Sequence, residues 1–183
     1  ATHLKIGQLL LQNSSEIEPE EKLFDIVGHL NLGIESIEKP SEREALAQLN
    51  LKAGRKARSS TAYTAARIYL QIGIDLLTIN CWVDQYELTL NLYVASAEAA
   101  YLNADFDGME KMAEQVLQKA QTILDKVKIY EISIGAQTAQ SQMLEAIAIG
   151  RDAREQLGVK LPTATDETKI GKALQNLASQ LQG

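Results

Sequence analysis

Histidine and cysteine, the side chains most often used for metal binding and nucleophilic catalysis, are rare in this sequence. The two histidines, His3 and His29, lie far apart and lack the Glu-x-x-His or Cys-x-x-Cys partners of a zinc site. We expect each of them to be a packed or surface side chain. The single cysteine, Cys81, has no basic neighbour to favour its thiolate, so we expect it to be buried with Trp82 at a junction between helical hairpins. The sequence therefore predicts no catalytic residue, no metal and no cofactor.

The paired carboxylates of the sequence lie at expected helix starts, where capping and the helix dipole account for them. They are Glu16 and Glu18, Glu20 and Glu21, and Asp105 and Asp107. The phosphate-binding and kinase signatures Gly-x-x-x-x-Gly-Lys-Ser/Thr, Gly-x-Gly-x-x-Gly, His-Arg-Asp and Asp-Phe-Gly do not occur. An α-helical enzyme would need a convergent acid/base or metal cluster, so we rank this class behind a binding function.

Residues 47–77 have the pattern of a helix–turn–helix hairpin. Small residues at Gly54 and Ala57 share one face of the first helix, which allows a second helix to approach closely. The Ser59-Ser60-Thr61 run supplies the turn and an N-cap. This spacing resembles a tetratricopeptide-type repeat, and the resemblance implies an array whose first helices line an inner, concave face.

The basic run of this hairpin is the candidate binding site. Arg55 and Arg58, one and four positions after the small residue, would point into the concave groove and could clamp an acidic peptide or a carboxylate. The alternative is that both arginines are solvated or paired with an acidic neighbour such as Glu98. The predicted groove consists of Gln48, Leu51, Arg55, Arg58, Asn91, Val94, Glu98 and Tyr101, with Glu131 and Thr138 at inward positions of the next unit.

The elements that position this groove are predicted to be helices. Pro19 marks one helix start, Ser41 opens a capping-box pattern at another, and Asp105 and Ser141 cap two more. Gly158 is placed to end a helix in the left-handed conformation. The predicted hairpins cover residues 3–33, 41–78, 83–124 and 126–157, with helices at 83–102, 106–124, 126–140 and 142–157, and an amphipathic helix follows at 166–181.

Equivalent positions recur along the chain at a nearly constant spacing. On the first helices the series is Gly54, Ala97 and Ile134, which advances by 43 and then 37 residues. On the second helices the series Ala66, Met109 and Ala146 advances by the same steps. A period near 40 with one hairpin per unit predicts an all-α fold of antiparallel helical hairpins stacked as a right-handed superhelix.

Composition limits the partners. The 183 residues are 45% hydrophobic and 5% aromatic, which favours helices, and the net charge of −6 argues against nucleic acid as a partner. A lone cysteine fits a reducing compartment, and no apolar run is long enough to cross a membrane, so we expect a soluble cytoplasmic chain with protein partners. The leucine-rich first helix would be poorly soluble unless covered, which makes it a candidate surface for homo-oligomers.

Seven short stretches, spread over nearly the whole chain, share one resemblance. They are residues 3–11, 22–27, 49–57, 81–82, 86–90, 124–128 and 157–162. These stretches resemble the helical-repeat region of very large multi-sensor signalling kinases, found especially in cyanobacteria. The resemblance implies that a Ser/Thr-kinase-like domain and an ATPase precede the repeats, and that a sensor and a histidine-kinase core follow them. The chain would then be a middle segment excised from a longer protein.

The function expected from these features is a non-catalytic protein-interaction and signal-transmission module of a multidomain signal-transduction kinase. The alternative is a stand-alone adaptor that captures a peptide in its concave groove. A self-contained adaptor should have polar helices at both ends, whereas only the C-terminal end of this sequence has that character.

Overall fold

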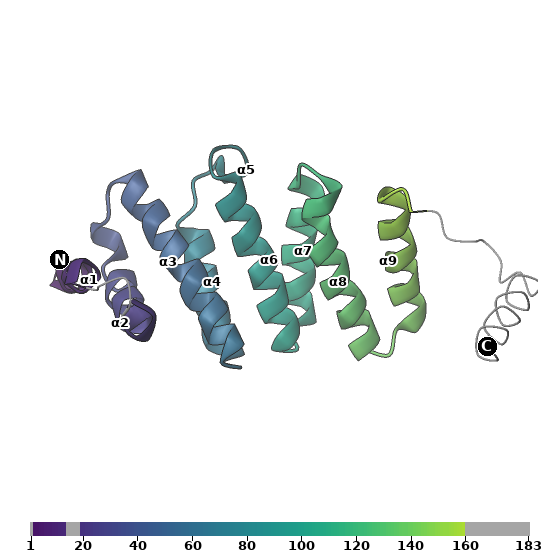
Figure 1. The fold of residues 1–183 in the computed structure, drawn as a ribbon, viewed down its shortest axis with the longest axis horizontal. Coiled ribbons are helices and arrows are strands. Elements are labelled where there is room, and N and C mark those ends of the chain that lie inside the picture. The colour runs from purple at the N-terminus through teal and green to yellow at the C-terminus, as the bar shows by residue number, and fades with distance from the viewer. Residues whose placement is uncertain (1, 14–18, 160–183) are drawn as a thin grey trace, which may run out of the picture.

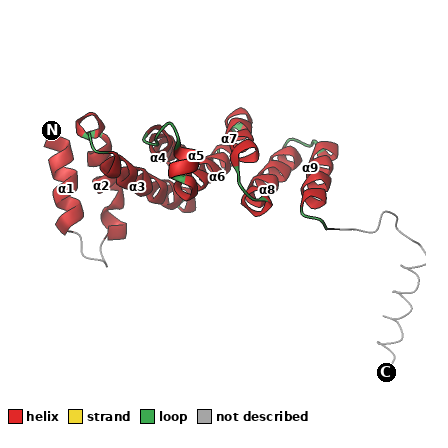
Figure 2. Cartoon of the chain, turned by 90° about the horizontal axis from the view of Figure 1, so that it is seen from above, coloured by secondary structure: helices red, strands yellow, loops and turns green. Residues whose placement is uncertain are grey.

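The computed structural model describes residues 2–13 and 19–159, and these residues form a single row of helices (Figure 1). The predicted amphipathic helix at 166–181 lies outside the described residues. Within the described ranges all regular structure is helical, so the all-α prediction is confirmed. Seen from above, the helices are joined by short loops (Figure 2). No helix in residues 2–13 or 19–159 has both the length and the apolarity needed to cross a membrane.

The helices follow one another along the row in chain order (Figure 1). They are α1 (Thr2–Asn13), α2 (Pro19–Asn31), the 3-10 turn η1 (Ile34–Ser36), α3 (Pro40–Ser59), α4 (Tyr63–Asp75), the single turn α5 (Cys81–Asp84), α6 (Tyr86–Leu102), α7 (Phe106–Lys119), α8 (Ile123–Ala139) and α9 (Met143–Gln156). The consecutive helices with the most contacts are α1 with α2, α3 with α4, α6 with α7, and α8 with α9.

Each hairpin packs on the next in the same way. Helix α6 contacts both α3 and α4, and α8 contacts both α6 and α7. The first helices α3, α6 and α8 therefore touch in succession, and α6 and α8 each cover both helices of the hairpin before them. This arrangement places the predicted groove residues, which all lie on α3 and α6, on neighbouring helices.

Three hairpin turns share one backbone conformation. Thr61, Ala104 and Ser141 have φ angles of 59°, 55° and 61°, and they are separated by 43 and then 37 residues. At each turn the following residue donates its N–H to a carbonyl five positions earlier, as Ala62 does to Ala57 at 2.9 Å. These are Schellman motifs, which end a helix by satisfying its last carbonyls. The turns thus recur with the same steps of 43 and 37 residues as the two series of helix positions.

Three predicted caps are wrong. Ser41 is not an N-cap, because Pro40 already occupies the first turn of α3 and Lys39 precedes it without a side-chain cap bond. The residue before α4 is Ala62, since Thr61 is used as the left-handed residue of the turn. Ser141 has the same role before α9 and does not cap that helix. Asp105 does cap α7, accepting the Gly108 N–H at 3.0 Å.

The boundary between the last two hairpins is also corrected. The helix predicted over 106–124 ends at Lys119, and the one predicted from 126 begins at Ile123. The reason is a capping box formed by Thr122 and Asp125. Thr122 Oγ1 accepts the Asp125 N–H at 3.3 Å, and Asp125 Oδ2 accepts the Thr122 N–H at 3.1 Å.

The predicted long helix over 83–102 is interrupted at Gln85, whose φ of −134° is not helical. Side chains hold this break in place. Thr89 Oγ1 donates to the Cys81 carbonyl at 3.1 Å, and Gln85 Oε1 accepts the Thr78 N–H at 3.3 Å. Cys81 is half-buried, not buried as expected, and the Trp82 ring packs on Tyr93 with centroids 5.3 Å apart.

Helix α1 is more closely packed than its sequence suggested. A Cβ atom on Gly7 would lie 2.7 Å from Leu30 of α2, and Leu4 and Leu10 pack against the core of the first hairpins. Leu9 and Leu11 remain 56% and 44% exposed. The expectation of an uncovered apolar surface on this helix therefore holds for Leu9 and Leu11 and is wrong for Leu4 and Leu10.

Candidate functional site

A groove of about 490 Å³ lies where α3, α6 and α8 adjoin, and we call it the α3/α6/α8 groove. Its lining residues are Arg55, Arg58, Leu90, Asn91, Val94, Ala95, Glu98, Asp125 and Lys128. Five of the eight residues predicted to form a groove are therefore brought together. The other three are elsewhere: Gln48 is exposed beyond the groove, Leu51 is buried, and Tyr101 stands over Gly135 with its hydroxyl 3.2 Å from where a Cβ would lie.

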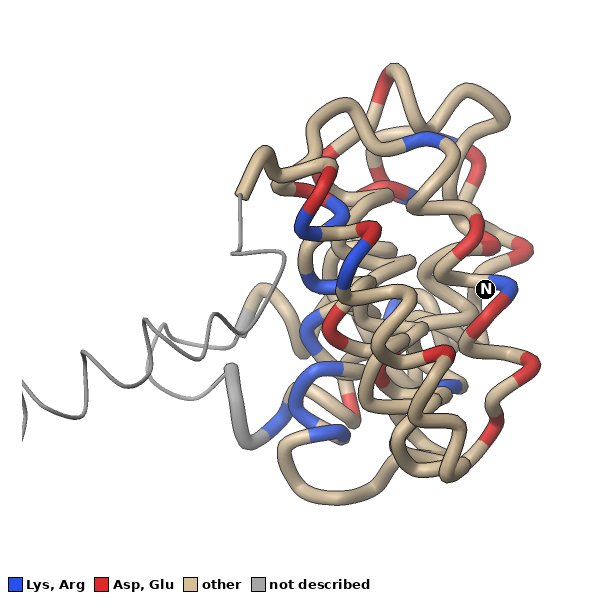
Figure 3. Tube along the Cα trace, turned by 90° about the vertical axis from the view of Figure 1, so that its right-hand side faces the viewer, with Lys and Arg blue, Asp and Glu red and all other residues tan. Residues whose placement is uncertain are grey.

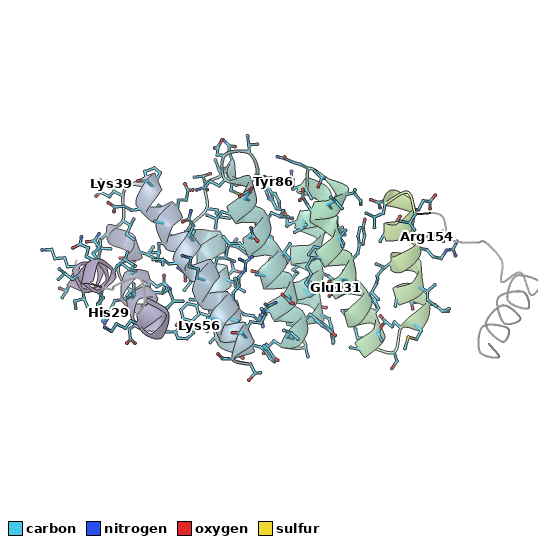
Figure 4. The ribbon with its side chains drawn as sticks, viewed as in Figure 1. His29, Lys39, Lys56, Tyr86, Glu131 and Arg154 are labelled. Carbon is cyan, nitrogen blue, oxygen red and sulfur yellow. The ribbon has the colours of Figure 1, made fainter. Side chains whose placement is uncertain are left out.

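The acidic and basic side chains of the groove are largely paired. Arg58 forms an ion pair and hydrogen bond with Glu98 across the α3–α6 contact. Lys128 Nζ lies 3.7 Å from Glu98 Oε1 and 3.0 Å from Glu131 Oε1, which is labelled on α8 in Figure 4. For Arg58 the ion-pair alternative raised by the sequence is what the structure shows. Lys128 and Asp125 were missed by the sequence reasoning.

Arg55 is different. Its guanidinium donates to Asn91 Oδ1 at 2.5 Å, and no carboxylate pairs with it among the residues that the structure describes. Partial burial, and to a lesser extent the charge of Arg58, lowers the pKa of Arg55. The groove therefore contains one cation whose partner is neutral, next to a second cation that is already compensated by Glu98.

The pairings follow the repeat. Arg55 lies six residues before the turn residue Thr61, and it contacts Asn91, which lies thirteen residues before the next turn residue, Ala104. Glu98 lies six residues before Ala104 and Lys128 lies thirteen residues before Ser141, and these two side chains also contact each other. The offset rule could have identified Lys128 from the sequence, because it occupies the same place in its unit as Asn91.

Asp125 closes the groove on the α8 side and is held as a carboxylate. Tyr86, at the start of α6 (Figure 4), donates its hydroxyl hydrogen to Asp125 Oδ2 at 2.7 Å and accepts the Gln121 N–H at 2.8 Å. The hydrogen bonds from Tyr86 and then from Thr122 lower the pKa of Asp125. Burial raises the pKa of Tyr86. The hydrogen-bonding needs of Asp125 are thus met within the protein.

Basic and acidic residues are mixed over the described part of the chain. In Figure 3 acidic positions run among the basic ones along the chain, in keeping with the net charge of −6. The lining of the α3/α6/α8 groove contains three cations, Arg55, Arg58 and Lys128, and two carboxylates, Glu98 and Asp125.

The two histidines, expected to be unrelated, meet between α1 and α2. Their Nδ1 atoms lie 3.0 Å apart, and the rings are stacked with centroids 5.3 Å apart; Figure 4 labels His29. The pairing brings two residues 26 positions apart into one hydrogen bond, which no local pattern indicates. Over residues 2–13 and 19–159, no cluster of three or more histidine, cysteine or acidic side chains could hold a metal ion.

Comparison with known proteins gives one informative similarity. The chain is 25% identical over 170 residues to hybrid signal transduction histidine kinase G of Dictyostelium discoideum. The aligned region covers 88% of this chain but only 5% of that protein, so the chain spans a small part of the length of the curated relative it matches. The sequence matches no protein-family model, and no solved structure shows significant similarity to it.

Proposed function

We propose that this chain is a non-catalytic protein-interaction and signal-transmission module of a multidomain signal-transduction kinase. The similarity to part of a hybrid histidine kinase, which extends over 88% of the chain, supports the signalling context. The α3/α6/α8 groove supports the interaction role. The proposed setting is cytoplasmic and the proposed partner is a protein, either another domain of the same polypeptide or a separate signalling component, and not a nucleic acid or a membrane.

The proposed architecture is a tetratricopeptide-like right-handed superhelix. Its support is the regular recurrence of the hairpin turn at Thr61, Ala104 and Ser141, together with first helices that touch in succession. An array in which each unit contacts only its neighbours bends as a spring and presents a long surface to a partner. A spring of this kind between two signalling domains would transmit a displacement from one to the other.

The observation that carries the interaction role is the state of Arg55. Its only hydrogen-bond partner in the groove is the neutral Asn91, so an incoming carboxylate would add an ionic contact without breaking an ion pair. A carboxylate can accept two parallel N–H bonds from one guanidinium, which makes an acidic side chain or a peptide C-terminus the best-matched ligand. Val94 and Leu90 beside it offer apolar contact for the neighbouring residue of such a peptide.

A direct test uses Arg55→Gln with Arg151→Gln as the matched control. Arg151 is exposed on α9, and both substitutions remove one positive charge. The probe is a fluorescently labelled Glu-rich hexapeptide, with binding followed by anisotropy at two salt concentrations. We expect Arg55→Gln to raise the Kd by about tenfold, as for loss of one charge-assisted contact, and Arg151→Gln to leave it unchanged. Equal effects of the two variants would mean that the peptide senses only net charge, and this would reject the groove.

Transmission is tested in a longer form of the protein that contains the proposed neighbouring domains. Hydrogen exchange is measured across the hairpins with and without nucleotide. We expect the exchange rates of α3, α6 and α8 to change with nucleotide, because a transmitted displacement alters the contacts between successive hairpins. Identical protection in both states would contradict the transmission role while leaving the peptide-binding result intact.

The alternative function is a stand-alone adaptor, which would use the same α3/α6/α8 groove. The exposed side chains of Leu9 and Leu11 favour the multidomain proposal or a homo-oligomer, since a self-contained adaptor would present polar ends. Sedimentation of the chain and of a Leu9→Glu, Leu11→Glu variant separates these cases. A concentration-dependent mass that the variant abolishes identifies self-association through α1.

A further inference from the structure

The last hairpin has an apolar groove that resembles the covered ones but is bare over the described residues. This α8/α9 groove has a volume of about 350 Å³. Its lining residues are Val127, Tyr130, Glu131, Ile134, Gly150, Ala153, Arg154, Leu157 and Val159. Val127, Leu157 and Val159 are 39%, 38% and 52% exposed.

In the earlier hairpins the corresponding groove is filled by the next first helix. A Cβ atom on Gly73 of α4 would lie 2.6 Å from Leu92 of α6, which shows how closely α6 covers that hairpin. In the next unit Val116 corresponds to Gly73 and Ile129 corresponds to Leu92, and both side chains are buried in one cluster. Ala153 is the third member of the series that contains Gly73 and Val116.

The sequence supplies a segment with the spacing of a covering helix. Residues 92, 95 and 99 of α6 and residues 129, 132 and 136 of α8 are all buried. Leu174, Leu177 and Leu181 repeat the same steps of three and four positions, and four of the five residues between them are polar. The segment 166–181 lies outside the described residues.

The end of α9 brings the chain to the edge of the groove. Gly158 has a φ of 70°, and Val159 donates its N–H to the Arg154 carbonyl at 3.1 Å, which is the Schellman geometry of the three hairpin turns. Val159 itself lines the groove. The six residues 160–165 can span up to about 20 Å, which is enough to begin a helix antiparallel to α9.

Charge fits the same orientation. Arg154, labelled near the end of α9 in Figure 4, lines the groove, and its Nε is buried without a hydrogen-bond partner among the described residues. A helix that starts beside the end of α9 would bring the carboxylates of Asp166 and Glu167 to this guanidinium. Carboxylates at the first turn of a helix are also favoured by its dipole.

We propose that residues 166–181 dock as a helix into the α8/α9 groove, antiparallel to α9, with Leu174 seated on Ala153 as Leu92 is seated on Gly73. The C-terminal segment of this chain thus closes the array itself, in place of a second copy or another protein. Its polar face, which includes Lys169, Lys172 and Asn176, is turned to solvent.

The test is disulfide trapping in the full chain, in a Cys81→Ser background. The first variant carries Ala153→Cys and Leu174→Cys, and the control carries Ala153→Cys and Asn176→Cys, two positions further along and on the opposite helix face. We expect the first pair to form an intramolecular disulfide at least about tenfold faster than the control, because docking holds the Cβ atoms within bonding range while a tethered coil brings them together only transiently.

Three results would overturn the proposal. Equal rates for the two pairs would show that no docked helix with this register exists. Disulfides that form between chains, at a rate that rises with concentration, would identify a second copy as the occupant. Hydrogen exchange provides a check that does not depend on cysteine geometry: Leu177→Asp should speed exchange of α8 and α9 amides at least about tenfold relative to Asn176→Asp, and equal exchange in both variants would also reject docking.

Discussion

Gly54 of α3 and Leu70 of α4 fit one another so closely that a Cβ atom on Gly54 would lie 2.5 Å from Leu70 Cγ. In the third unit the equivalent positions hold Ile134 and Gly150, and there the large residue is on the first helix; Ile134 Cδ1 would be 3.7 Å from a Cβ on Gly150. The middle unit has alanine at both positions, Ala97 and Ala113. In each hairpin the two facing positions share a limited volume. A large residue at one position is accompanied by glycine at the other, or both positions hold alanine.

This volume rule predicts the effect of Gly54→Ala. The added methyl group must displace Leu70, at a cost of about 1–3 kcal/mol for overpacking, which exceeds the roughly 1 kcal/mol gained in helix propensity. The control is Gly28→Ala in α2, where a Cβ would meet nothing within 4 Å, and it should stabilise the protein by about 0.5–1 kcal/mol. Urea unfolding measures both effects.

The rescue variant is Gly54→Ala with Leu70→Ala, which copies the middle unit. Leu70→Ala alone should cost about 2–5 kcal/mol through its cavity, and the double variant should be less destabilised than the sum of the single variants. Strict additivity of the two substitutions would show that Gly54 and Leu70 do not compete for the same space.

A second prediction concerns the left-handed turn residues. Ala104 has a φ of 55°. Its methyl side chain forms no hydrogen bond, so replacement by glycine removes none. Ala104→Gly should therefore raise the free energy of unfolding by about 0.5–1 kcal/mol, because relief of backbone strain outweighs the greater entropy of the unfolded glycine. Ser60→Gly, at a φ of −91°, should not stabilise the protein. Thermal unfolding in which both variants gain equally would contradict the strain explanation.

A third prediction concerns the ion pair between Arg58 and Glu98. Their side chains are 31% and 21% exposed, and a double-mutant cycle with alanine should give a coupling energy of about 0.5–1 kcal/mol that decreases as sodium chloride is added. The control cycle uses Lys39 and Glu42, which are 74% and 39% exposed, and should give a smaller coupling. Equal couplings in the two cycles would show that the groove does not strengthen its ion pair.

A fourth prediction follows from the lowered pKa of Asp125. Because protonation is harder in the folded state, the Asp125 carboxylate stabilises the fold at pH values above its ordinary pKa, and this contribution is lost as the pH falls through the folded-state pKa. The hydrogen bond from Tyr86 is the largest cause, so Tyr86→Phe should raise the pKa of Asp125 and destabilise the protein by about 0.5–1.5 kcal/mol at pH 7.

The Tyr86→Phe loss should shrink in acid, where Asp125 is protonated in both proteins. NMR titration of the Asp125 carboxylate gives the pKa directly, and urea unfolding at pH 7 and at low pH gives the stability difference. Tyr93→Phe is the control, because it also removes one tyrosine hydroxyl. The Tyr93 ring packs on Trp82, and the hydrogen bond to Asp125 comes from Tyr86. An unchanged Asp125 pKa in Tyr86→Phe would mean that Thr122 alone holds the carboxylate.

The sequence by itself determined the helical class, the hairpin turns with their steps of 43 and 37 residues, the cap at Asp105 and the left-handed Gly158. It also placed Arg55, Arg58 and Glu98 on faces that meet. These features depend on residues within a few positions of one another or on a constant period, so their signals are present in the linear order of residues. The capping box at Thr122 is equally local, although it is not among the caps predicted from the sequence.

Only the tertiary structure decided which charges are neutralised. Arg58 pairs with Glu98 while Arg55, three residues earlier on the same helix, contacts the neutral Asn91. The two arginines and their partners are 36 and 40 positions apart in the sequence. Which partner each arginine meets therefore depends on how α6 packs against α3. The contact between His3 and His29, which are 26 positions apart, likewise depends on how two helices pack and not on a local sequence pattern.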